Sequence, residues 1–155
     1  MRDLAPPRQR YVAFVRAADR PGSLTAVAEV MSSRGVSIES FRSSARLSGT
    51  AMLTLVFSTS ARLERLIERT LARLAAVSDV TVLPADAPRV RAVGVVHAAP
   101  GRRFIPPGDA AVTWSGDTSL DQPLLIEGTL VDVEKVLAAA VAEGAALVSS
   151  IVLPP

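Results

Sequence analysis

Apolar and polar residues in the first half of the chain follow two different periods. Residues 11–15 form a continuous apolar run of strand-type side chains. From Ser23 onward the apolar positions recur every three or four residues, at Leu24, Val27, Ala28 and Met31. That spacing predicts a helix with one apolar face, and Ser23 is the expected N-cap residue.

Three more strands and one more helix are predicted in the first half. Residues 36–45 alternate in polarity, which favours a strand packed on one side, and residues 51–57 are apolar enough for a central strand. A hairpin loop at 47–50 is expected to join these two strands, and a short strand is expected at 80–83. Ser60 is placed to cap a helix whose predicted buried stripe is Leu63, Leu66, Ile67, Leu71 and Leu74.

The second half repeats this order without its first helix. Residues 99–108 contain three prolines, and proline breaks the hydrogen-bond ladder of a helix, so we expect a loop there. The other expected elements are strands at 90–97, 110–114, 124–127 and 148–153 and a helix at 130–142. We therefore predict an α+β protein of two ferredoxin-like (βαββαβ) units. The expected domains are 10–84 and 89–155, and the second is degenerate, with its first helix replaced by a loop.

The composition fits a folded protein and argues against several kinds of chemistry. The 155 residues are 49% hydrophobic and include no cysteine and a single histidine, His97. Disulfides, thiolate metal sites and a cysteine nucleophile are therefore excluded, and a histidine metal cluster or proton relay is not expected. We predict no catalytic residue, no metal and no cofactor.

The chain also lacks the features of membrane or exported proteins. No apolar run reaches the ~18 residues of a membrane helix. The polar start of the chain, with Pro6 and Pro7, lacks the apolar stretch of a signal peptide. We expect a cytoplasmic protein that has no membrane partner.

Charge is distributed unevenly along the chain. Residues 1–84 carry 12 arginines against 7 acidic residues, a net charge of +5, whereas residues 85–155 carry a net charge of −3. A net charge of +5 alone does not predict nucleic-acid binding, and we expect none. Four arginines of the second helix form one stripe, which either docks an acidic partner or is simply solvated; we favour the solvated face. These arginines are Arg62, Arg65, Arg69 and Arg73.

The most informative segment is the turn from strand to helix at Asp19, Arg20, Pro21, Gly22, Ser23 and Leu24. The free backbone N–H groups around residues 23–26, together with the helix dipole, make a site suited to a carboxylate. Gly22 allows a ligand to approach the backbone, and Asp19 is suited to an ammonium group. A free amino acid carries both groups. The alternative is that proline and glycine only make a tight turn that Ser23 caps.

This segment resembles the signature of an ACT domain, an acidic residue followed by Arg-Pro-Gly-x-Leu. Residues 34–41, Arg-Gly-Val-Ser-Ile-Glu-Ser-Phe, are similar to the Arg-Gly-Tyr-Asn-Ile-Glu-Ser-Leu segment of the small regulatory subunits of acetolactate (acetohydroxyacid) synthase. The similarity covers residues 11–83 well and is weak over 89–153. It implies that the N-terminal unit is an ACT domain and that the C-terminal unit is ACT-like.

The resemblance implies a non-catalytic regulatory subunit. Such subunits form homodimers, bind a branched-chain amino acid between two protomers and modulate a catalytic thiamine-diphosphate-dependent large subunit. Asp19 stands where the family has a ligand-contacting Asn, and residues 22–24 would hold the carboxylate. Ser37 and Ile38 from the partner chain would close the site. Ser37 replaces another Asn of the family, so the alternative is a ligand-free ACT-type dimerisation module that activates a partner enzyme.

Overall fold

The computed structural model describes residues 7–45 and 49–155. The chain divides into two compact units with the boundary between Ala85 and Asp86. Most of the predicted hairpin loop at 47–50 lies outside the described residues.

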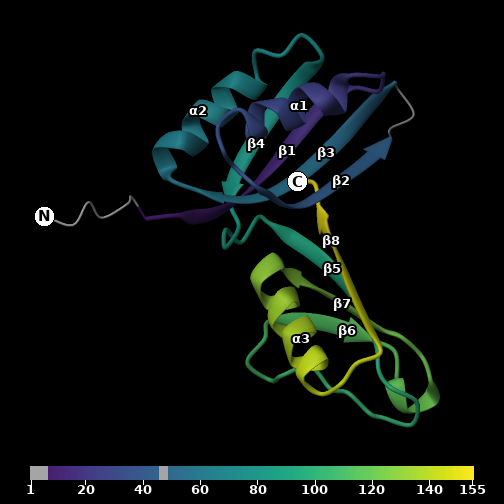
Figure 1. The fold of residues 1–155 in the computed structure, drawn as a ribbon. Helices are drawn as coiled ribbons and strands as arrows, with labels where there is room; N and C mark the ends of the chain where they lie inside the picture. The colour runs from purple at the N-terminus through teal and green to yellow at the C-terminus, as the bar shows by residue number, and fades with distance from the viewer. Residues whose placement is uncertain (1–6, 46–48) are drawn as a thin grey trace, which may run out of the picture. The chain divides into compact units, whose positions relative to one another are not determined.

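The first unit is one four-stranded antiparallel sheet with two helices (Figure 1). Its strands stand in the order β2-β3-β1-β4, so β3 is internal, as its apolar sequence predicts. The elements are β1 (Gln9–Ala18), α1 (Ser23–Ser32), β2 (Ile38–Ala45), β3 (Thr50–Thr59), α2 (Ala61–Leu71) and β4 (Val77–Pro84). This is the predicted ferredoxin-like order.

The core of the first unit lies between the sheet and both helices. Alternate residues of β1 enter it, from Tyr11 to Ala17, and the ring of Tyr11 stacks on Phe57 with 6.0 Å between the ring centroids. From α2, Ile67 and Leu71 are fully buried. Ser60 caps α2 as predicted, because its Oγ accepts a hydrogen bond from the N–H of Leu63 at 3.3 Å.

The predicted buried stripe of α2 is wrong at one position. Leu63 and Leu74 pack partly buried against the core, whereas Leu66 is 43% exposed. Leu66 follows Arg62 by four residues and precedes Arg69 by three, so it lies beside the arginine stripe rather than over the sheet.

β2 is an open edge of the sheet. Among the described residues, only β3 pairs with it, and residues 39–44 are all exposed, so the prediction that one side of this strand is packed is wrong beyond Ile38. The pairing register shifts between Ile38 and Ser40, which places a bulge at Glu39. An edge strand with unpaired backbone groups is a natural place for a second chain to add.

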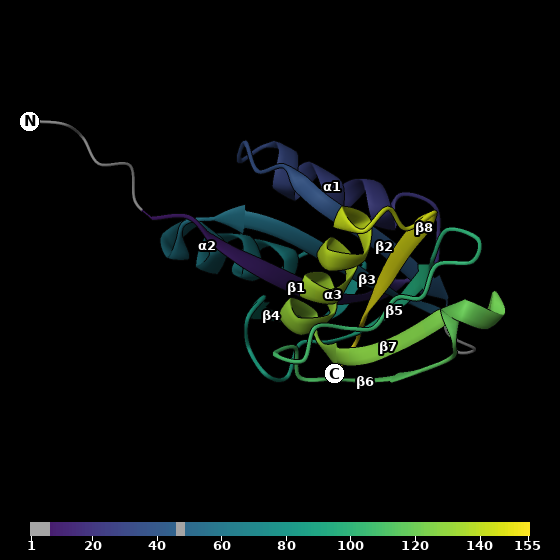
Figure 2. The ribbon, with the colours of Figure 1, turned by 90° about the horizontal axis from the view of Figure 1, so that it is seen from below.

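The second unit has the same strand order with one helix fewer. Its sheet runs β6-β7-β5-β8, which matches β2-β3-β1-β4 strand for strand. The helix α3 covers one face of this sheet (Figure 2). The elements are β5 (Arg91–His97), β6 (Val112–Ser115), the short 3-10 helix η1 (Thr118–Leu120), β7 (Leu124–Thr129), α3 (Leu130–Ala142) and β8 (Leu147–Leu153).

A loop takes the place of the missing helix, as predicted. Phe104 on this loop is buried, and its N–H donates to Oγ1 of Thr118 at 2.8 Å. The far end of the loop is held to α3, because the N–H of Ala111 donates to Asp132 and Lys135 pairs with Asp109. These contacts fix a segment that has no regular structure of its own.

Within the described ranges, no helix is long and apolar enough to cross a membrane.

Candidate functional site

The strand that leads into the candidate turn is held on both sides. The N–H of Ala18 donates to the carbonyl of Ala76 at 2.8 Å, and the N–H of Asp19 donates to the carbonyl of Gly49 at 2.9 Å. The chain is therefore fixed where β1 ends. Asp19, Arg20, Pro21 and Gly22 are all exposed.

Gly22, not Ser23, is the N-cap residue of α1. Gly22 has a φ of 90° and Ser23 is the first helical residue, so the predicted side-chain cap is absent. No other atom would crowd a Cβ at Gly22, yet a positive φ of this size favours glycine over residues with a side chain. Ser23 is only 7% exposed, and its Oγ finds no hydrogen-bond partner in the described part of the chain.

The backbone donors of this turn are only partly free. The N–H of Ser23 donates to the carbonyl of Arg20 at 3.3 Å, and that of Ala26 donates to Gly22 at 2.9 Å, so the prediction that both are free is wrong. The N–H groups of Leu24 and Thr25 have no partner among residues 7–45 and 49–155. They are the orphan donors of the first helical turn. With the positive end of the helix dipole, they favour a carboxylate.

An open cleft of about 350 Å³ lies at this turn. One wall is the predicted segment 20–23 with Ala26, and the other is residues 74–76, which connect α2 to β4. Sequence reasoning missed this second wall, because it is brought in by the Ala18–Ala76 hydrogen bond between distant segments. Leu24 lies outside the cleft with 47% of its surface exposed.

Ser37 and Ile38 do not join this turn within one protomer. Ile38 pairs with Phe57 and Ala18 pairs with Thr50, so the two segments lie at opposite ends of β3. Phe57 lies seven positions after Thr50, a distance of about 24 Å along a strand. Ser37 is exposed and Ile38 is half-buried. Only a second chain could bring these residues to the turn.

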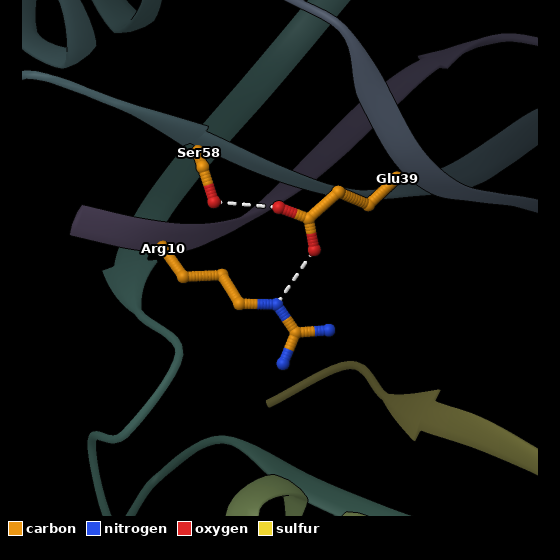
Figure 3. A network of polar contacts seen from close by, with 3 residues as sticks. All are labelled: Arg10, Glu39 and Ser58. Carbon is orange, nitrogen blue, oxygen red and sulfur yellow. Dashed lines mark hydrogen bonds and ion pairs between the residues drawn. The ribbon is translucent and has the colours of Figure 1, made fainter. Parts of the chain in front are cut away.

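A polar network fixes the start of β2, next to Ser37 and Ile38 (Figure 3). The Nε of Arg10 donates to Oε2 of Glu39 at 2.8 Å, and the Oγ of Ser58 donates to Oε1 at 2.5 Å. The hydrogen bond from Ser58 and the charge and hydrogen bond of Arg10 hold the pKa of Glu39 below its usual range, although burial opposes the shift. The network spans β1, β2 and β3, and sequence reasoning did not anticipate it.

The lowered pKa of Glu39 predicts a pH dependence of stability. The native carboxyl binds protons less readily than the same carboxyl in the unfolded chain, whose pKa is near 4.5. The stabilisation is therefore complete above that pH and is lost as the pH falls through the native pKa. Urea unfolding of Glu39→Gln at pH 3 to 7 should show a shallower loss of stability toward acid than the parent. Because the pair is exposed, we expect an effect below about 1 kcal/mol.

Glu29→Gln is the control for this measurement, because Glu29 is an exposed carboxyl on α1 with no ion pair in the described ranges. A Glu39→Gln profile that is parallel to the parent profile between pH 3 and 5 contradicts the role of the network.

The second unit has a polar network of its own, in which Asp132 accepts hydrogen bonds from Oγ1 of Thr129 and from the N–H of Ala111. His97 ends β5 with an exposed side chain. Among the described residues, no group of three His, Cys, Asp or Glu side chains is arranged to hold a metal ion.

Comparison with known proteins bears on the fold. No family model and no curated protein matches the sequence. The acetolactate synthase small subunit from Thermotoga maritima superimposes with a TM-score of 0.62 at 14% identity, over 95% of this chain and 99% of that one. This chain has the fold of that small subunit. The regulatory subunit of aspartate kinase from Thermus thermophilus, in its ligand-free form, matches with a TM-score of 0.49 at 11% identity, over 88% and 93% of the two chains.

The resemblance predicted from the motifs at 19–24 and 34–41 is thus confirmed at the level of the fold. The match to the Thermotoga small subunit covers 95% of this chain and so extends into the second unit, where the sequence similarity is weak. The two ferredoxin-like, ACT-type units are an α+β arrangement of two four-stranded antiparallel sheets.

Proposed function

We propose that this chain is a non-catalytic regulatory subunit that binds a small amino acid, of the branched-chain type, between two copies of itself. It modulates an acetolactate-synthase-type, thiamine-diphosphate-dependent enzyme in the cytoplasm. The observation that carries the proposal is the pair of unpartnered N–H groups of Leu24 and Thr25 at the start of α1, beside an open cleft. The fold shared with the Thermotoga small subunit supports the regulatory class.

The turn has the groups that a zwitterion needs. The free N–H groups of Leu24 and Thr25 would donate hydrogen bonds to the ligand carboxylate. The Oγ of Ser23, which is buried and has no partner in the described chain, is a further donor at this turn. Asp19 is exposed and would bind the ammonium group. The exposed side chain of Leu24 would pack against an apolar ligand side chain, which favours Val, Leu or Ile over a polar amino acid.

Pairing of two β2 edges would complete the site. Two copies of β2 that pair antiparallel about a two-fold axis run in opposite directions. The start of one strand then lies beside the end of the other, which is the end of the sheet where β1 leads into its turn. Ser37 and Ile38 of the partner subunit would thereby reach the turn at 19–24. The network around Glu39 would hold them in place.

The ligand would act by favouring one arrangement of the dimer. A ligand that binds two arrangements of the dimer with equal affinity does not shift the equilibrium between them. The contacts of the amino acid with the two protomers must therefore differ between the two arrangements. A site shared between protomers meets this requirement, because its geometry changes whenever the two chains move relative to each other. The catalytic subunit would bind one of the two arrangements, so its activity would follow the fraction of the dimer in that arrangement.

Removal of Asp19 should weaken amino-acid binding without unfolding the protein. Asp19→Ala deletes the carboxylate proposed to bind the ammonium group, and a charged hydrogen bond of this kind corresponds to about a tenfold loss of affinity. Isothermal titration calorimetry with Val, Leu and Ile measures it. Asp86→Ala, which removes an exposed carboxylate from the connection between the two units, is the control and should bind as the parent does.

No heat with any of the three amino acids, at protein concentrations where the dimer forms, would overturn the ligand proposal. Equal affinities of Asp19→Ala and the parent would overturn the role of Asp19 alone.

The second candidate is a ligand-free ACT-type dimerisation module that activates a partner enzyme. Ser37 favours it, because the exposed hydroxyl is shorter than the Asn amide of the resembling family and has fewer donors. The two candidates differ in one measurement. Activity of the catalytic subunit that rises equally with and without added Val, Leu and Ile supports the ligand-free module.

A further inference from the structure

The outward side of α2 carries a leucine that the fold does not use. Leu66 is 43% exposed, although it lies on a helix whose other leucines pack partly or wholly into the core. Leu66 and Leu63, with Ser60, Arg62 and Arg69, line a hollow of about 230 Å³. The lining of this hollow combines two leucine side chains with two arginines.

Three arginines of α2, and Arg73 two residues beyond its end, continue the side of the helix that carries Leu66. They are spaced so that each lies three or four residues from the next, and we call them the basic face: Arg62, Arg65, Arg69 and Arg73. All four are exposed, and no carboxylate lies within ion-pair distance of any of them in the described part of the chain. The Nε of Arg69 donates to the carbonyl of Arg65 at 3.2 Å, a bond that leaves its charge unneutralised.

The two acidic residues of α2, Glu64 and Glu68, are half-buried, whereas the four arginines are exposed. Burial raises the pKa of Glu64, and the neighbouring charge of Glu68 raises it further. Glu64 in turn contributes to the raised pKa of Tyr11, a core residue of β1, and the charge of Arg65 acts in the opposite sense on the pKa of both groups. Glu64 therefore offsets part of the charge of Arg65, but neither carboxylate forms an ion pair with an arginine of the basic face in the described part of the chain.

A fifth guanidinium is fixed close to Leu66. Arg34 donates to Oγ1 of Thr70 at 2.9 Å and to the carbonyl of Val30 at 3.1 Å, and Thr70 donates in turn to the carbonyl of Leu66 at 2.7 Å. Arg34 is thus held between α1 and α2 by hydrogen bonds to neutral groups. Its positive charge adds to that of the basic face.

We propose that the basic face and the Leu66 hollow together dock an acidic amphipathic helix of a partner protein. An apolar side chain of the partner would fill the hollow, while carboxylates one turn apart would pair with the arginines. The eleven residues of α2 extend over about 16 Å, which matches three turns of a partner helix. This surface shares no residue with the cleft at the turn, so the inference goes beyond the proposed function and does not require amino-acid binding.

A protein partner fits this surface better than a nucleic acid does. Single-stranded nucleic acids are usually bound by aromatic side chains that stack on the bases, and no residue of Ala61–Leu71 is aromatic. Phosphate contacts would also leave the aliphatic hollow unfilled. A helix docked in a groove typically buries an apolar side chain and places charged side chains opposite groups of the other sign.

The test uses the full chain and a fluorescent helical peptide of about 18 residues with glutamates on one face and leucines beside them. Fluorescence anisotropy should show saturable binding that weakens as salt is raised. Replacement of the peptide's glutamates with glutamines should abolish the binding. Arg62→Gln/Arg69→Gln should weaken it about fivefold to tenfold, as expected for two exposed ion pairs. Leu66→Ala should weaken it severalfold, because the hollow loses its apolar contact.

Arg102→Gln/Arg103→Gln is the matched control, since it removes two exposed arginines from a loop of the second unit and should leave binding unchanged. Three results would overturn the proposal: no saturable binding by the parent protein, equal binding by the α2 variants and the parent, or tighter binding of a DNA oligonucleotide than of the peptide. If a variant melts at a lower temperature than the parent, the comparison of the glutamate and glutamine peptides on the parent protein still tests the proposal.

Discussion

Leu71→Ala is expected to lower the free energy of unfolding by about 2–5 kcal/mol. Leu71 is the last residue of α2 and is completely buried in the core between the helices and the first sheet. Truncation to alanine removes its contacts with the sheet and leaves a cavity that rigid strands on one side cannot fill. Urea unfolding followed by circular dichroism measures the loss as a lower midpoint.

Leu66→Ala is the matched control, because it makes the same change five residues earlier on the same helix. Leu66 is 43% exposed, so its truncation should cost less than about 1 kcal/mol. The comparison removes any contribution from helix propensity, which is equal for the two substitutions. Similar losses in the two variants would contradict the assignment of the inner and outer sides of α2.

Gly116→Ala should cause the largest loss of stability from a single added methyl group in the second unit. Gly116 has a φ of 101°, and a Cβ there would lie 2.2 Å from the carbonyl oxygen of Pro123, which is backbone and cannot turn away. The strained backbone alone costs about 1–3 kcal/mol, and the displacement of residue 123 adds to it. Trp114 is the only tryptophan and lies two residues earlier on β6, so its fluorescence reports unfolding of this unit.

Gly108→Ala is the control for that measurement. Gly108 lies in the loop that replaces the missing helix, and a Cβ there would meet no atom within 4 Å. Its φ is outside the positive range, so the change should alter stability by no more than about 0.5 kcal/mol. A Gly116→Ala protein that is as stable as Gly108→Ala would show that the turn between β6 and β7 relaxes without cost.

Local periodicity was enough to predict most elements of the fold. The helix expected at 130–142 begins and ends at those residues, because its apolar face repeats without interruption and Thr129 caps it. The exchange of a helix for a loop in the second unit was also predictable, since prolines at 100, 106 and 107 exclude a helix. Errors arose where the outcome depended on geometry, as at Leu66, which fits the stripe by spacing yet lies at its margin.

The candidate site was less predictable than the fold. Serine is a preferred N-cap residue, but Gly22 occupies the N-cap position of α1, with a positive φ. The sequence pattern alone does not distinguish Gly22 from Ser23 as the cap. The second wall of the cleft, residues 74–76, comes from a hydrogen bond between segments far apart in sequence. The bulge at Glu39 likewise depends on how β2 pairs with β3. Contacts of this kind follow from the assembled sheet and not from local spacing.

The placement of Ser37 and Ile38 at the far end of the sheet from the turn at 19–24 has a quantitative consequence for the proposed function. When a binding site is divided between two molecules, its apparent affinity for the effector depends on the abundance of the protein itself, by mass action. Dilution would separate the halves and make the protein less responsive to the same amount of effector. A cell could therefore tune its sensitivity to that metabolite through expression level alone.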